Sequence, residues 1–99
     1  MTTGSTSVRA ADARFVSGID PADLRGEYAD RDLHHWSDAR LIAAVAQIVS
    51  IPRQDRSNSF ILHAPLEVSA RAALLPRVMP VDRELARLHI LAVAAQYEA

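Results

Sequence analysis

The stretch that decides the fold is residues 59–76, which read SFILHAPLEVSARAALLP. It is the densest run of large apolar residues in the chain, and His63 and Glu67 stand four positions apart inside it. Because of Pro65, a helix here can begin in two ways. It can begin near His63, with the proline in its first turn, where proline is tolerated, or at Phe60 with a bend at the proline, which costs about 3 kcal/mol in a helix interior. We expect the helix to begin between residues 60 and 64, or to bend at Pro65, and to end before Pro76.

The segments on either side also carry helix signals. Asp20-Pro21 combines a capping residue with a proline at the first helical position, Ser37 caps the next segment, and Pro80 opens the last one. Period-two alternation and hairpin turns, the marks of strands, are missing. The sequence therefore predicts an all-α fold, a small bundle or array of three to four helices at about 21–30, 38–50, 60/64–75 and 81–98.

The chain of 99 residues is long enough for one domain. Residues 1–8 are small and polar, which predicts a disordered tail before a single helical domain at 9–99. This domain either folds alone or is part of a larger fold, such as a truncated piece of a longer protein.

Composition narrows the classes of partner. A net charge of −1 gives no basic surface for nucleic acid. The longest run without charge, residues 41–52, is too short to span a bilayer, which needs about 20 apolar residues. The chain has no cysteine. We therefore expect a cytoplasmic protein that binds neither nucleic acid nor membrane.

The helices predicted at 38–50 and 81–98 have apolar residues on two sides. Three or four short helices would leave part of this surface uncovered, and large exposed apolar patches usually mark an interface. We therefore predict a homo-oligomer or a larger helical partner, with these interface residues: Leu41, Val45, Ile48, Ile90, Val93 and Tyr97.

His63, Glu67 and Arg71 are spaced four apart and would share one face of a helix. His63 and Glu67 are candidate catalytic residues, with the carboxylate orienting the imidazole. Two structural interpretations stay open. The three residues could be an exposed polar stripe with a Glu67–Arg71 pair, or His63 could cap or pack at a helix start.

A second polar cluster surrounds Trp36 and contains Asp30, Asp32, His34, His35 and Asp38. Two imidazoles with nearby carboxylates can bind a divalent metal, so His34 and His35, alone or with His63, are candidate metal ligands. The alternative is a polar surface turn, since neighbouring histidines on a helix point in different directions.

Asn58-Ser59, followed by His63-Ala64-Pro65-Leu66 and an Ala/Leu-rich helix, is similar to a local pattern of questin-oxidase-like proteins. The similarity covers about ten residues, and Phe60-Ile61-Leu62 intervene between the serine and the histidine. It implies a larger helical protein linked to oxidative ring-opening of aromatic polyketides, of which this chain would be a piece. Only His63 carries over.

Two functions from different classes follow. The first is a small helical self-association or protein-interaction module without catalysis of its own. The alternative is an oxidoreductase-type helical protein, or an N-terminal fragment of one, that uses His63 and Glu67 near a metal or organic cofactor of unknown identity. Whether the chain is an enzyme stays open at this level.

Overall fold

The computed structural model describes residues 10–53 and 59–99, which are helices joined by short turns, with no strand among them. The all-α prediction is confirmed, and the predicted tail at 1–8 lies outside the described residues. Residues 10–15 are helical. The elements that follow, with η for a 3-10 helix, are η1 (Pro21–Asp23), α2 (Leu24–Asp30), η2 (Leu33–His35), α3 (Asp38–Val49), α4 (Ser59–Leu74), η3 (Leu75–Arg77), η4 (Pro80–Asp82) and α5 (Arg83–Glu98).

Two of the predicted caps form as expected. The Asp20 side chain accepts a hydrogen bond from the amide of Ala22, and the Ser37 hydroxyl accepts one from the amide of Arg40. The segment predicted as one helix at 21–30 consists of two elements. Its first turn after Asp20 is the 3-10 helix η1, and the α-helix α2 follows. None of the helices in the described ranges is long and apolar enough to cross a membrane.

Helix α4 starts at Ser59, so Pro65 lies in its interior and not in its first turn. Proline has no amide hydrogen, and the carbonyl of Ile61 therefore lacks the donor that a regular helix would supply. Phe60 and Ile61, in the turn before the proline, pack partly buried against the core. This burial offsets the cost of the proline and explains why the helix begins earlier than the range predicted from the sequence.

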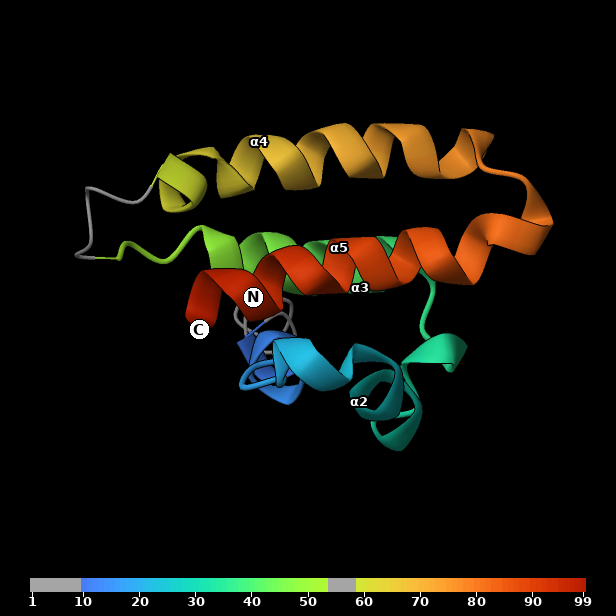
Figure 1. The fold of residues 1–99 in the computed structure, drawn as a ribbon, viewed down its shortest axis with the longest axis horizontal. Helices are drawn as coiled ribbons and strands as arrows, with labels where there is room; N and C mark the ends of the chain where they lie inside the picture. Colours follow the sequence, from blue (N-terminus) through green and yellow to red (C-terminus); the bar gives the residue numbers. More distant parts are fainter. Residues whose placement is uncertain (1–9, 54–58) are drawn as a thin grey trace, which may run out of the picture.

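Helix α5 is the centre of the arrangement. Helices α3 and α4 pack against it and against each other, while η1 and α2 pack on α5 as well. Figure 1 shows α4 along one edge, α3 and α5 in the middle, and the N-terminal segment with α2 on the opposite side. Helix α5 is therefore covered from two sides by its own chain.

The six residues predicted at an interface lie in this core. Leu41, Val45 and Ile90 are fully buried, and Ile48, Val93 and Tyr97 are 2–4% exposed. The second apolar side of α5, which was predicted to be uncovered, is covered in part by η1 and α2. In this conformation these six side chains are occupied by contacts within the chain, and a partner surface has to be sought elsewhere.

Among the residues that the structure describes, the core holds one charged side chain, Arg87, which is 3% exposed. Its guanidinium donates to the Tyr28 hydroxyl at 2.8 Å, to Asp38 Oδ1 at 2.6 Å and to the carbonyls of Leu33 and Trp36 at 2.7 and 2.8 Å. Arg83, one turn earlier on α5, also pairs with Asp38. Arg87 therefore joins α5 to α2, to η2 and to the first turn of α3.

We expect Arg87→Met to destabilise the fold by about 3–5 kcal/mol, because the Tyr28 hydroxyl and the carbonyls of Leu33 and Trp36 lose their donor and Asp38 keeps only Arg83 as a partner. Urea unfolding followed by circular dichroism measures the change. The control is Arg25→Ala on the exposed side of α2, where we expect a change within about 0.5 kcal/mol. An Arg87→Met protein as stable as the control variant would contradict this role.

Burial raises the pKa of Tyr28, and a nearby Glu84 adds to the rise against the opposing effect of Arg87. The folded chain thus holds this proton more tightly than the unfolded chain, whose tyrosines ionise near pH 10. The stability that Tyr28 contributes is complete below about pH 10 and is lost as the pH rises above it. An ultraviolet titration of phenolate should show a late-ionising tyrosine that is missing in Tyr28→Phe. If both proteins titrate alike, this assignment is wrong.

Candidate functional site

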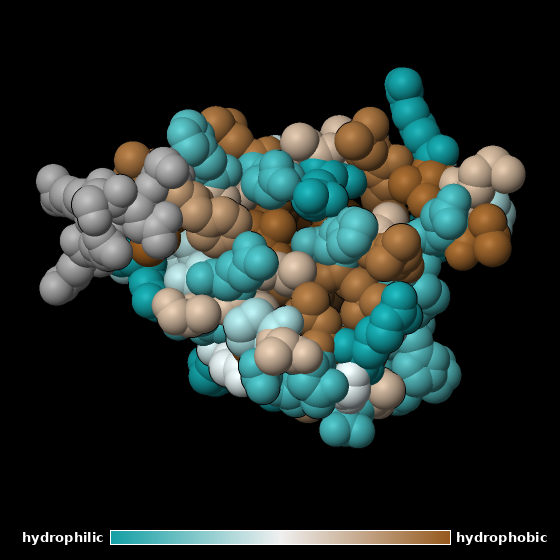
Figure 2. Space-filling view, in the orientation of Figure 1, coloured by the Kyte–Doolittle hydropathy of each residue, from teal (hydrophilic) through white to brown (hydrophobic). Residues whose placement is uncertain are grey.

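The leucine side chains with the highest exposed fractions among the described residues lie on α4, on the side that faces away from the core. Leu62, Leu66 and Leu74 are 63%, 69% and 59% exposed, and Ala70 and Ala73 between them are exposed as well. We call these five residues the α4 outer face. Figure 2 shows hydrophobic residues along the edge of the molecule that α4 forms.

The periodicity of the sequence produces this second face. Ala64, Val68 and Leu75 recur at three- to four-residue spacing and are buried against the core. The positions on the opposite side, Leu62, Leu66, Ala70 and Leu74, are spaced four apart as well. Residues with this spacing lie on one side of a helix. Helix α4 is therefore apolar on two sides, but its own chain covers only one of them.

Within α4, the carboxylate of Glu67 has Arg71 as its partner. Glu67 Oε1 accepts from Arg71 Nε and contacts Arg71 Nη2, both at 3.0 Å, so the carboxylate is engaged by the arginine. His63 is exposed. The arrangement matches the exposed polar stripe that the sequence left open, with Arg71 as the partner of Glu67.

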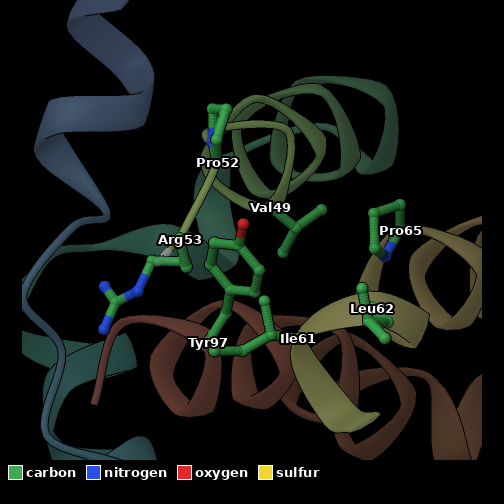
Figure 3. A pocket seen from close by; sticks show the side chains of 7 residues that line it. All are labelled: Val49, Pro52, Arg53, Ile61, Leu62, Pro65 and Tyr97. Atoms are coloured by element: carbon green, nitrogen blue, oxygen red, sulfur yellow. The ribbon is translucent and has the colours of Figure 1, made fainter. Parts of the chain in front are cut away.

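A pocket of about 550 Å³ lies near one end of α4, beside the C-terminal parts of α3 and α5. Figure 3 shows the ring of Tyr97 beside Ile61 and Val49. The lining residues are Val49, Pro52, Arg53, Ile61, Leu62, Pro65 and Tyr97. Neither His63 nor Glu67 is among them, and the Tyr97 hydroxyl donates to the carbonyl of Ile51. The pocket is mainly apolar and brings no acid–base pair together.

The second cluster predicted from the sequence does assemble in part. His35 Nδ1 lies 2.9 Å from Asp32 Oδ2, and His34 Nε2 lies 3.4 Å from Asp32 Oδ1. The two imidazole rings are 4.1 Å apart between centroids. One donor atom from each of these three residues falls within 4.8 Å of the other two. The hydrogen bond with His35 and the charge of both histidines lower the pKa of Asp32. We call these three residues the histidine turn.

The backbone of this turn brings the neighbouring histidines together. Asp32 has φ 58°, in the left-handed region, and directly follows the C-cap of α2 at Arg31. The next three residues form η2 instead of an α-helix. The expectation that adjacent histidines diverge applies to a continuous α-helix, and this turn avoids that geometry.

The other residues of the predicted cluster lie apart from the histidine turn. Asp38 pairs with Arg83 and Arg87. His63 belongs to α4, which lies across the α3–α5 layer from the histidine turn in Figure 1, and it is not among the donors that converge there. The turn therefore groups His34 and His35 with Asp32, without His63.

Two features of the structure were not predicted from the sequence. Arg87 was not singled out, although it lies one turn from Arg83 and at helical spacing from Ile90, Leu91 and Ala94, so that an apolar stripe continues from it. Exposed apolar surface was predicted on α3 and α5 instead of α4, where a second run of apolar residues at four-residue spacing gave the signal.

No family model, curated protein or solved structure matches this chain. The similarity to questin-oxidase-like proteins around His63 therefore stays a prediction from a short stretch of sequence. The enzyme alternative based on His63 and Glu67 stays a prediction as well. Functional inference depends on the two surfaces described above, the α4 outer face and the histidine turn.

Replacing Asp32 with glycine tests the backbone of the turn. Glycine adopts the left-handed region without the penalty that a side chain incurs there, and exposed ion pairs contribute little. Relief of this strain, about 1 kcal/mol or more, should exceed the extra entropy that glycine gives the unfolded chain, so we expect Asp32→Gly to stabilise the protein by about 0.5 kcal/mol, measured as a shift in the urea midpoint. A clear loss of stability would mean that contacts with the histidines, and not the local backbone, hold the turn.

Proposed function

We propose that the protein is a helical self-association module without catalysis of its own, and that two copies pair through the α4 outer face. The observation that carries this proposal is the exposure of Leu62, Leu66 and Leu74 on a single helix face. Contiguous exposed apolar surface on a small folded domain usually marks an interaction site. No other described element packs over this side of the helix in Figure 1.

The order of large and small residues favours a second copy as the partner. In an antiparallel pair of α4 helices related by a two-fold axis near Val68, Leu62 lies opposite the partner's Leu74, and Leu66 lies opposite the partner's Ala70. A two-fold interface uses the same patch on both subunits, so the patch has to be complementary to itself. At the centre of the contact, Leu66 opposite Ala70 puts a large residue against a small one, which allows the two helices to approach closely.

Charge also permits this contact. The five residues of the α4 outer face carry no charge, so none has to lose its hydration on pairing. Glu67 and Arg71 pair with each other on the same helix and neutralise one another. The net charge of −1 for the whole chain gives little repulsion between copies, and proteins of low net charge associate more readily.

We expect the purified chain to form a dimer, measured by size-exclusion chromatography with light scattering and by sedimentation equilibrium. Leu66→Glu should shift the population to monomer, because it puts two buried charges without partners at the centre of the contact. Since Leu66 is 69% exposed in the single chain, circular dichroism and urea stability should stay close to those of the original protein.

Val81→Glu is the matched control. Val81 is 86% exposed and lies in η4, outside the α4 outer face, so the same substitution there should leave the dimer intact. A wild-type chain that stays monomeric up to millimolar concentration would refute self-association. Equal dissociation by both glutamates would show that the contact is not on α4.

A further inference from the structure

We infer that the histidine turn binds one divalent transition-metal ion, with a carboxylate oxygen of Asp32 and the imidazoles of His34 and His35 as ligands. Water would complete the coordination, since all three side chains are exposed. Zn²⁺ is the reference ion for this site.

The separations between the donor atoms fit a metal of this size. Ligands at about 2.0–2.1 Å from Zn²⁺ stand about 3.3–3.4 Å apart in a tetrahedral site and about 3 Å apart when adjacent in an octahedral one. The two carboxylate–imidazole separations in the turn are 2.9 and 3.4 Å. These separations run to different oxygens of Asp32, and one donor atom from each residue lies within 4.8 Å of the other two, so side-chain rotation has to bring the three donors to within about 3.4 Å of one another.

The buried core holds the backbone of the turn in place. Leu33, between Asp32 and the histidines, is fully buried. One guanidinium nitrogen of Arg87 donates to the carbonyls of Leu33 and Trp36, the residues directly before and after the histidine pair. The ligands thus project from a short segment fixed at both ends, which reduces the conformational entropy lost on binding.

The chemistry of the donors selects the kind of ion. Imidazole nitrogen suits Zn²⁺, Cu²⁺, Ni²⁺ and iron, whereas Mg²⁺ and Ca²⁺ prefer an all-oxygen shell. A set of two imidazoles and one carboxylate therefore predicts binding of Zn²⁺ and no measurable binding of Mg²⁺.

This site is separate from the proposed dimer surface, because the histidine turn lies on the opposite side of α5 from α4 in Figure 1. Metal binding should therefore be the same in wild type and in Leu66→Glu. Failure of the metal proposal and failure of the self-association proposal can thus be told apart.

The test is calorimetric titration of the full chain, without a histidine tag, with Zn²⁺. We expect saturable binding of one ion per chain, and a loss of about tenfold or more in affinity in each of Asp32→Asn, His34→Gln and His35→Gln. Asparagine also tolerates the left-handed backbone, so Asp32→Asn removes the charged ligand and keeps the turn. Circular dichroism should show each variant folded.

The chain supplies its own matched controls in its two other histidines. His63 lies on α4 and His89 on α5, and both are exposed. His63→Gln and His89→Gln should leave the affinity for Zn²⁺ unchanged. The absence of saturable binding in the wild type would overturn the proposal. Equal losses in the His63 or His89 variants would overturn it too, because they would show dispersed binding by surface histidines.

Discussion

The fold depends on the buried guanidinium of Arg87. The Arg87 side chain is only 4% exposed, so the surrounding protein has to supply acceptors to replace the lost hydration of its guanidinium. It does so with Asp38, the Tyr28 hydroxyl and the carbonyls of Leu33 and Trp36. A buried charge of this kind is tolerable only when nearly every donor is satisfied. This requirement sets how α2, η2 and α3 meet α5.

The same constraint connects the core to the surface chemistry of the molecule. The acceptors of Arg87 include the carbonyls of Leu33 and Trp36, which flank His34 and His35. Hydrogen bonds from the buried guanidinium therefore fix the backbone that carries these two imidazoles. Asp32, in the left-handed region at the end of α2, turns its carboxylate toward both rings. Glycine is the usual residue at such a position. The presence of an acid there is consistent with a role for the side chain.

Helix α4 relates differently to the rest of the fold. One side of it closes the core through Ala64, Val68 and Leu75, and the other side leaves leucines in water. Burial of a leucine side chain contributes roughly 1.5–3 kcal/mol, and these leucines do not contribute it within the single chain. A second molecule that covered them would supply this stabilisation. Pro65 does not prevent this helix, because Phe60 and Ile61 before it are packed against the core.

The sequence by itself determined the helices and several of their ends. Caps such as Asp20 and Ser37 act on amides two or three residues away, and such local chemistry can be read along the chain. Tertiary structure alone decided which faces are covered. The acceptors of Arg87 lie 49 to 59 positions away from it, and no local pattern specifies contacts over that distance. The pairing of His34 with His35 depends on the backbone of Asp32, and the exposure of the α4 outer face depends on which side of α4 packs against α3 and α5. Local interactions fix the elements, whereas burial is a property of how distant elements pack.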